Sequence, residues 1–229
     1  MRKLAIVGYG KMGKLIEQLA PEYDFEVALK LDEFNNPDGS GLTSANFQGV
    51  DVAIEFSIPA AVPGNVKGVA ACGVPIVVGT TGWLEHIDGV RATVAAYGTG
   101  LVWSPNFSIG VNVFFRLVAA AARLLADEPA YGSWAWEIHH AAKKDAPSGT
   151  LLKLVDEMKK AGYARGIDVG SNRAGTIPGT HEIGFDSAAD TITLRHTARS
   201  REGFARGALK AAQWIVGKKG FYEFGEIEF

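Results

Sequence analysis

The chain of 229 residues lacks several features that assign a protein to a class. It has a single cysteine, Cys72, which cannot form an internal disulfide and has no metal-ligating neighbours in the sequence. No apolar run is long enough to cross a bilayer, and the first three residues lead into an apolar strand rather than a signal peptide. We therefore expect a cytoplasmic protein with no membrane partner and no metal.

An excess of charge of one sign is also missing. Lysine and arginine number 23, aspartate and glutamate 25, and the formal net charge is −2. Proteins that bind nucleic acid usually carry a basic surface, so we expect no nucleic-acid partner. The chain is long enough to bury a large core and to form one large or two modest domains.

A glycine-rich loop stands between an apolar strand, residues 4–7, and a segment with helical spacing. In such a GxGxxG pattern the glycines permit a tight turn, close approach of the backbone to a pyrophosphate, and close packing of the helix on the strand. The context predicts a dinucleotide site. Its predicted residues are Gly8, Tyr9, Gly10, Lys11, Met12 and Gly13.

A second apolar run, residues 25–31, ends at Asp32, whose carboxylate can accept hydrogen bonds from the ribose of adenosine. The alternative is that Asp32 only begins a solvated loop with Glu33 and Asn35. A 2′-phosphate usually requires a cation here, whereas the chain has two acidic residues, so we expect NADH to be preferred. Lys11 could still reach a phosphate, so we expect NADPH to be tolerated.

The first half of the chain alternates apolar strands, around 51–57 and 75–78, with a helical segment at 60–71. This alternation predicts a parallel sheet, in which ligands bind beyond the carboxyl ends of the strands. Two loops lie at such ends, and either could be an ordinary turn. Together with the glycine loop they favour nicotinamide and ribose contacts by Gly79, Thr80 and Thr81, and by Ser104, Pro105, Asn106 and Phe107.

The pattern changes after Phe107. A long helical stretch, 111–127, precedes strands predicted at 133–139, 181–185 and 191–196, the last two forming a hairpin. We expect an α/β protein with a Rossmann-like dinucleotide-binding domain and an α+β substrate-binding domain that has an open mixed sheet. The expected bounds are 1–108 completed by 209–229 for the first domain, and 109–208 for the second.

Residues 137–150 concentrate two imidazoles, two ammonium groups and two carboxylates before a predicted helix start. His139 and His140 are adjacent and can point to different parts of one ligand. Ser148, Gly149 and Thr150 would lie where free backbone N–H groups and the helix dipole attract an anion. The segment suits reduction of a small carboxylated substrate, given a source of hydride.

The same segment, Glu-x-His-His-x-x-Lys-x-Asp-Ala-Pro-Ser-Gly-Thr, resembles the dihydrodipicolinate reductase family when taken with GxGxxG, Gly-Thr-Thr-Gly at 79 and Asn-Phe-Ser at 106. The resemblance runs over essentially the whole chain, although the segment between Lys160 and Arg173 is short for the family. It implies an NAD(P)H-dependent reductase of lysine and diaminopimelate biosynthesis. The implied substrate is a cyclic imine dicarboxylate, which loses water and accepts hydride before the resulting enamine is protonated.

The resemblance also implies roles for the residues. His139 would be the acid-base group and Lys143 a second proton donor or a charge partner, while His140, Ser148, Gly149 and Thr150 would hold the substrate carboxylates. Imidazole titrates near working pH, whereas a lysine would need a depressed pKa, so chemistry favours His139 as the acid.

The family resemblance further suggests a homotetramer built through the second domain, and a hinge between the domains that closes to exclude water. We expect His181 and His196 to be ordinary sheet histidines outside the site, and Glu137 to pair with cations or to orient a histidine. Two alternatives stay open: another two-domain NAD(P)-dependent dehydrogenase, and a non-catalytic sensor that binds NADH.

Overall fold

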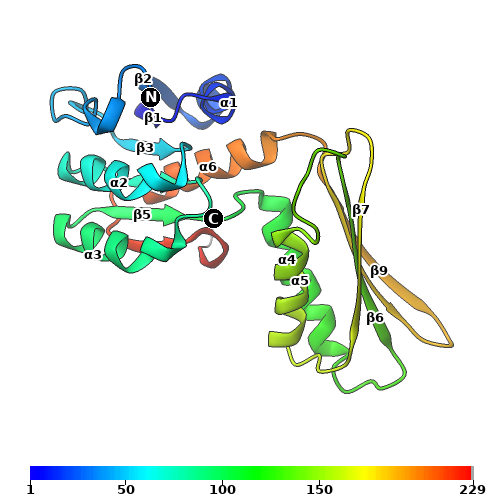
Figure 1. Cartoon of the computed structure of the whole chain (residues 1–229). Coiled ribbons are helices and arrows are strands. Elements are labelled where there is room, and N and C mark those ends of the chain that lie inside the picture. Colours follow the sequence, from blue (N-terminus) through cyan, green and yellow to red (C-terminus); the bar gives the residue numbers. More distant parts are fainter. Residues whose placement is uncertain (228–229) are drawn as a thin grey trace. The chain divides into compact units, whose positions relative to one another are not determined.

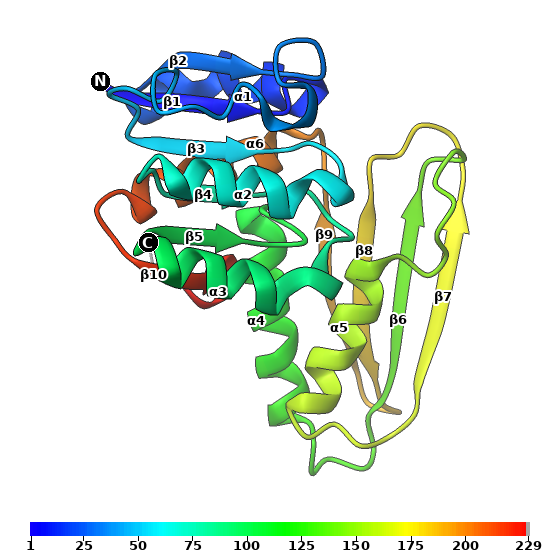
Figure 2. The same cartoon turned by 60° about the vertical axis from the view of Figure 1, so that its left-hand side comes forward.

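The computed structural model describes residues 1–227 and divides into two compact units, which Figures 1 and 2 show in two orientations. Unit 1 comprises residues 1–108 and the described part of 202–229, and unit 2 comprises Ile109–Arg201. The chain thus leaves unit 1 after Ser108 and returns at Glu202. The expected return between residues 208 and 209 would cut through a helix, α6 (Glu202–Ile215), which belongs to unit 1 as a whole.

Unit 1 is a Rossmann-like layered domain. Its six strands are all parallel, in the order β10-β5-β4-β3-β1-β2, with helices packed on both faces. The strands are β1 (Arg2–Val7), β2 (Phe25–Leu31), β3 (Val52–Glu55), β4 (Ile76–Val78), β5 (Gly100–Trp103) and β10 (Gly220–Glu223). The helices are α1 (Lys11–Leu19), α2 (Val62–Ala71), α3 (Ile87–Tyr97) and α6, with 3₁₀ turns at Ala20–Tyr23, Pro37–Gly39, Pro59–Ala61, Leu84–His86 and Phe224–Glu226.

The central strands of this sheet have continuous apolar runs because both of their faces are covered. Residues 4–7 of β1 and 52–54 of β3 are at most 1% exposed. The C-terminal segment contributes to this sheet, since β10 pairs with β5 and extends the parallel order. All the carboxyl ends of the strands therefore face one edge, at which a dinucleotide would bind.

Unit 2 is a mixed four-stranded sheet, in the order β7-β6-β8-β9, with two helices on one face. The strands are β6 (Gly132–His139), β7 (Ile167–Arg173), β8 (Thr180–Asp186) and β9 (Thr191–Thr197), and the helices are α4 (Ile109–Leu124) and α5 (Gly149–Lys160). β6 and β7 are parallel, whereas the other pairs are antiparallel. The predicted mixed sheet and the hairpin between β8 and β9 are confirmed.

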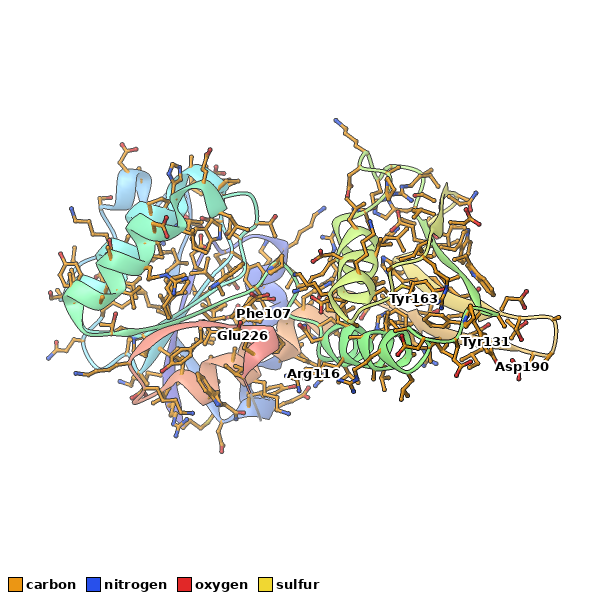
Figure 3. All side chains as sticks on the ribbon, turned by 90° about the horizontal axis from the view of Figure 1, so that it is seen from below. Phe107, Arg116, Tyr131, Tyr163, Asp190 and Glu226 are labelled. Atoms are coloured by element: carbon orange, nitrogen blue, oxygen red, sulfur yellow. The ribbon has the colours of Figure 1, made fainter. Side chains whose placement is uncertain are left out.

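Alternation along β6 decides which side chains reach the core of unit 2. Ser133, Ala135, Glu137 and His139 are buried beneath the helices, while the tryptophans between them lie half-buried on the other face. Around the far end of the sheet, Tyr163 is fully buried and its hydroxyl donates to the carbonyl of Tyr131 at 2.8 Å (Figure 3). Polar side chains of β6 thus point into an otherwise apolar core.

The described residues, 1–227, contain no helix that is both long and apolar enough to span a bilayer.

Candidate active site

Glu137 is the centre of the polar cluster in unit 2. Its side chain is fully buried, and Oε1 accepts hydrogen bonds from the Ser148 N–H at 2.8 Å, the Ser171 hydroxyl at 2.7 Å and the Arg173 guanidinium at 2.9 Å. Oε2 accepts a further bond from the Ser148 hydroxyl. Burial alone would raise the pKa of Glu137, but these hydrogen bonds outweigh it and lower the pKa to about 2. The carboxylate is therefore ionised at neutral pH and ties β6 to β7 and to the start of α5.

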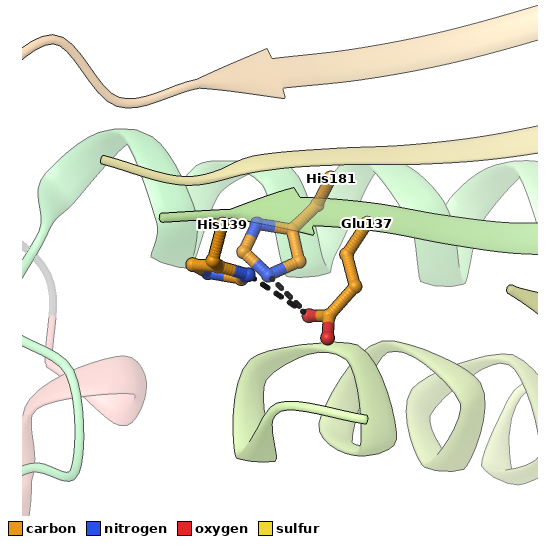
Figure 4. A group of neighbouring side chains, drawn as sticks. All are labelled: Glu137, His139 and His181. Carbon is orange, nitrogen blue, oxygen red and sulfur yellow. Dashed lines mark ion pairs between the residues drawn. The ribbon is translucent and has the colours of Figure 1, made fainter. Parts of the chain in front are cut away.

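His139 lies two residues further along β6, on the same face as Glu137. Its Nδ1 is 3.5 Å from Glu137 Oε2, and Figure 4 shows the ring beside that carboxylate. Burial lowers the pKa of His139, and the charges of Lys143 and Arg173 lower it further, whereas Glu137 raises it. The net shift is downward, so in the absence of a ligand the ring is mainly neutral at neutral pH.

The other ring nitrogen of His139 faces a glycine. A Cβ atom built on Gly179 would lie only 2.8 Å from Nε2, and Gly179 has a positive φ of 151°. Any side chain at this position would crowd the nitrogen. Nδ1 is thus turned toward Glu137, and Nε2 is the ring nitrogen on the side of Gly179.

His181 is a member of the cluster that the sequence analysis left out. It pairs across the sheet with Glu137, and its Nε2 is 3.3 Å from Glu137 Oε2 and 3.3 Å from the Ser148 hydroxyl oxygen (Figure 4). The rings of His139 and His181 have centroids 5.0 Å apart. Burial, and then the charge of His139, lower the pKa of His181 to about 4, so this ring is neutral at neutral pH.

Glu137, His139 and His181 each offer a possible metal-ligating atom, and these atoms lie within 4.8 Å of one another. A cation placed among them would compete with the donors already on Glu137. One of those donors is the guanidinium of Arg173, whose positive charge lies 2.9 Å from Oε1. The arrangement favours a fixed internal ion pair over metal binding.

The loop between β6 and α5 carries Lys143. Its ammonium group contacts both carboxylate oxygens of Asp145, at 2.7 and 2.8 Å, and this contact lowers the pKa of Asp145. The carbonyl of Asp145 accepts a bond from Arg173, which fastens the loop to the Glu137 cluster. His140 is half-buried and its carbonyl accepts the Lys143 N–H at 3.1 Å, forming a turn.

Ser148 is the N-cap of α5, where it was predicted to bind an anion. The structure differs, because the Ser148 N–H is donated to Glu137 and its hydroxyl oxygen accepts the Leu151 N–H at 3.2 Å. Its side chain is only 2% exposed. Gly149, which is exposed, and Thr150, which is half-buried, form the first turn of the helix, where N–H groups have no partner within the helix.

The three glycines of the loop after β1 have three different roles. Gly8 has φ of 95°, and a Cβ there would lie 2.1 Å from the carbonyl oxygen of Phe56. A Cβ on Gly13 would lie 2.6 Å from the carbonyl oxygen of Gly8, so this glycine allows α1 to pack against β1. Around Gly10 nothing lies within 4 Å of such an atom, so the loop leaves space there, as close approach of a pyrophosphate requires.

The remaining residues of this loop differ in exposure. Lys11 is exposed and Met12 half-buried. Tyr9 donates its hydroxyl proton to Glu17, which also forms an ion pair with Lys30 at 3.0 Å. Lys30 lies near the end of β2, but its ammonium group is already paired with Glu17 in unit 1.

Asp32 follows β2 and is half-buried. Its Oδ1 accepts the backbone N–H of Phe34 at 2.9 Å and of Asn35 at 3.2 Å. Asp32 therefore does begin a loop, as the alternative interpretation of the sequence expected. It does not conflict with the predicted ribose contact, because a carboxylate has a second oxygen.

The loops after β4 and β5 contain both structural and accessible residues. Thr80 is buried and its hydroxyl oxygen accepts the Ser57 N–H at 2.7 Å, whereas Thr81 is exposed. The ring of Phe56 fills the space beside Gly79, where a Cβ would lie 2.1 Å from a ring atom. Of the predicted contacts after β4, Thr81 is the one whose side chain faces solvent.

After β5, the Ser104 hydroxyl donates to the carbonyl of Asn106 at 2.8 Å, so this loop is closed by its own side chain. Pro105 is exposed and Asn106 half-buried. Phe107 is 2% exposed, and its ring packs against Phe224 with centroids 4.8 Å apart. This ring was predicted to contact the cofactor, but it belongs to the core of unit 1.

Comparison with known proteins supports the resemblance on both units. The family model described as dihydrodipicolinate reductase, N-terminus, matches residues 2–107, and the model for its C-terminus matches residues 110–227. A solved structure, a dipicolinate-bound dihydrodipicolinate reductase from Paenisporosarcina sp. TG-14, has the same fold, with a TM-score of 0.85, 23% identity and coverage of 100% of both chains.

Two curated relatives named 4-hydroxy-tetrahydrodipicolinate reductase are similar over nearly their full length. The protein from Christiangramia forsetii is 34% identical, and the alignment covers 98% of this chain and 96% of the relative. The protein from Methanoregula boonei is 36% identical, with 99% and 98% covered. The chain therefore belongs to the dihydrodipicolinate reductase family.

Proposed function

We propose that the chain is a 4-hydroxy-tetrahydrodipicolinate reductase in which His139 supplies the proton. The reaction converts the substrate, NAD(P)H and a proton to tetrahydrodipicolinate, NAD(P)⁺ and water. The observation that carries the proposal is the buried contact between the carboxylate of Glu137 and Nδ1 of His139, with Nε2 facing the glycine at 179. The dinucleotide supplies hydride when it is bound in unit 1.

The charges around the two histidines favour His139 over His181 as the proton donor. With a pKa of about 4, His181 is almost entirely in its neutral form at neutral pH. It can therefore orient its neighbours but cannot serve as the acid. The pKa of His139 is also lowered, mainly by burial. A bound dicarboxylate would add negative charge beside the ring and raise that pKa, so the substrate itself favours the protonated acid.

Lys143 acts as a charge partner in this proposal. Its ammonium group forms an ion pair with Asp145 at 2.7 Å. A fixed positive charge on the loop suits attraction of the dicarboxylate. His140 and the backbone N–H groups of Gly149 and Thr150 would hold the carboxylates, with the positive end of α5 adding to the attraction.

NADH is the proposed preferred cofactor, with NADPH tolerated. Asp32 and Glu33 follow β2, where a 2′-phosphate would need a cation, and the nearby Lys30 is already paired with Glu17. Lys11 is exposed and could contact a phosphate. Initial rates with both cofactors test this point: a much lower Michaelis constant and higher turnover with NADPH would contradict it.

We also propose a homotetramer that covers the open face of the sheet in unit 2. Trp134 and Trp136 lie on that face, half-buried within one chain. A second sheet would bury their remaining apolar surface. Light scattering during size-exclusion chromatography tests the state, and a monomer at micromolar concentration would contradict the proposal.

The reaction and the proposed acid can be tested in one assay. Substrate is generated in place by dihydrodipicolinate synthase from pyruvate and aspartate semialdehyde, and NADH oxidation is followed for the parent and for His139→Gln. We expect turnover in the parent and a loss of about a hundredfold or more in the variant, the usual contribution of a positioned acid. The matched control is His86→Gln, which changes an exposed histidine of unit 1 and should leave the rate unaltered.

A second pair of variants distinguishes the effect of Lys143 on substrate binding from that of the adjacent Lys144. Lys143→Ala should raise the Michaelis constant for the substrate, whereas Lys144→Ala, which changes an exposed lysine, should have little effect. If the parent binds NADH but reduces no substrate, the reductase is excluded and the sensor becomes the better hypothesis. If another substrate is reduced much faster, the protein is a different two-domain dehydrogenase.

A further inference from the structure

A second buried glutamate, Glu55, lies at the cofactor edge of unit 1 and has no place in the chemistry proposed above. It is the last residue of β3, in register with Val7 of β1 and Val78 of β4. Its side chain is 0% exposed. A carboxyl group is rarely buried so completely without a cation, so its contacts require an explanation.

The contacts of Glu55 hold one short segment of chain. Oε1 accepts the N–H of Ser57 at 3.1 Å and the hydroxyl of the same residue. The side chain of Asn65 in α2 donates to Oε1 at 3.3 Å and to the Ser57 oxygen at 3.2 Å. Glu55 therefore holds both the backbone N–H and the hydroxyl of Ser57.

That segment, Phe56–Ser57, touches the loops that follow three other strands. The Phe56 carbonyl occupies the space where Gly8 of the glycine loop would carry a Cβ. The Phe56 ring occupies the space where Gly79 would carry a Cβ. The centroids of the Phe56 and Phe107 rings are 6.4 Å apart. The Ser57 N–H is shared with Thr80, which stands in the loop after β4. The spacing of these loops thus depends on where the segment lies.

We propose that Glu55 is a positioning residue for the dinucleotide: by holding Ser57 it sets the distance between the glycine loop and the loop after β4. This inference rests on the proposed function, because the glycine loop and the loop after β4 are the cofactor-binding elements of the proposed reductase. Glu55 itself would not touch the cofactor. Its effect would be on dinucleotide affinity and not on proton transfer, which the proposal places in unit 2.

The pKa shift of Glu55 agrees with these contacts. Burial raises its pKa, and the hydrogen bonds from Ser57, Thr80 and Asn65 offset only part of the rise. The groups that donate to it, from the loop after β4, from α2 and from its own loop, are these neutral ones. An amide oxygen can accept the same hydrogen bonds from Ser57 and Asn65, so glutamine should preserve the arrangement.

The test measures NADH binding by fluorescence titration for the parent, Glu55→Gln and Glu55→Met. Methionine keeps the volume but removes the acceptor for Ser57. A lost hydrogen bond in a buried site weakens binding by about fivefold or more, so we expect that increase in the dissociation constant for Glu55→Met and less than about twofold for Glu55→Gln. Turnover at saturating NADH should change little in either variant, which gives a split between Michaelis constant and turnover number.

Two further variants keep the inference falsifiable. Ser57→Ala removes the hydroxyl that contacts Glu55 and Asn65, in a residue that is exposed as a whole, so the risk to folding is small and the dissociation constant should rise by about threefold. Ile76→Val alters a fully buried residue at the opposite end of β4 and should lower the melting temperature without changing NADH affinity. Unaltered affinity in both Glu55→Met and Ser57→Ala would overturn the inference, as would a loss in Ile76→Val equal to that in Glu55→Met.

The inference and the proposed function fail in different ways. NADH binding requires no substrate, so a parent that binds NADH but reduces nothing still tests Glu55. If such a parent shows the expected losses in the variants, the positioning role stands while the reductase does not. A parent that binds no dinucleotide would overturn both.

Discussion

Replacing Glu137 by glutamine should destabilise unit 2 by an amount that the pKa of the carboxyl group sets. The folded structure lowers that pKa from 4.5 to about 2, a change of about 2.5 units. At about 1.4 kcal/mol per unit, the folded state favours the ionised form by about 3 kcal/mol at neutral pH. Glu137→Gln loses this contribution, because an amide oxygen cannot replace the charge opposite Arg173.

The stability lost in Glu137→Gln should become smaller as the pH falls. A carboxyl group with a lowered folded pKa contributes stability that is fully present above its unfolded value, near 4.5, and is lost as pH falls toward about 2. Urea unfolding of the parent and of Glu137→Gln should therefore differ by about 3 kcal/mol at pH 7, and the difference should shrink steadily below about pH 4.5. Thermal unfolding at pH 7 should shift by about 6–12 °C.

The matched control is Glu182→Gln. Glu182 lies on the next strand of the same sheet, half-buried, and its ion pair with Arg195 is longer, at 3.6 Å. We expect a change below about 0.5 kcal/mol for this partly exposed pair. Equal stability of Glu137→Gln and the parent at pH 7 would refute the reasoning, and so would a loss that stays the same between pH 7 and pH 3.

Three further changes test the packing. Gly184→Ala would bring a Cβ 2.0 Å from the ring of Trp134 and should cost about 1–3 kcal/mol in urea unfolding, more than Gly170→Ala, where the nearest ring atom is 3.0 Å away. Phe107→Ala should cost about 3–5 kcal/mol, whereas Phe107→Leu should keep NADH affinity within about twofold by titration, because the ring is a core residue. Ser148→Ala removes a helix cap and should cost about 1 kcal/mol or more by the same unfolding assay.

The glycine loop could be predicted from sequence because its determinants are local. A strand, three glycines and a helix within residues 4–19 define one turn, and the turn fixes what each glycine must do. Even there, the contact that excludes a side chain at Gly8 comes from Phe56, in the loop after β3. The need for glycine was predicted, but the residue that imposes it was not.

The membership of His181 in the site could not be predicted from spacing alone. It follows from the antiparallel register of β6 and β8, which places His181 opposite Glu137, and register depends on the whole hairpin and sheet. One signal did exist. His181 shares a face with Ile183 and Phe185 by alternation, so it had to point into the core, where a histidine needs a polar partner.

β7 was missed for a different reason. In its sequence, Ile-Asp-Val-Gly-Ser-Asn-Arg, the apolar alternation stops after Ile167 and Val169. The next residues of the same face of this edge strand, near the site, are Ser171 and Arg173. Both contact Glu137. The polar residues that hide the strand in the sequence are thus the ones that complete the cluster.

The two buried glutamates show how the pKa of one residue type can shift in opposite directions in one chain. Each lies at or near the end of a central strand and is 0% exposed, so desolvation acts to raise the pKa of both. Glu137 receives a guanidinium 2.9 Å away in addition to its hydroxyl and backbone donors, and its pKa falls to about 2. Glu55 receives only neutral donors, and its pKa stays raised. The hydroxyls of Ser148 and Ser171, and then the guanidinium of Arg173, keep a negative charge on Glu137 beside His139, where it can favour a protonated ring. The raised pKa of Glu55 instead shifts its balance toward the neutral form, at an edge that should receive an anionic pyrophosphate.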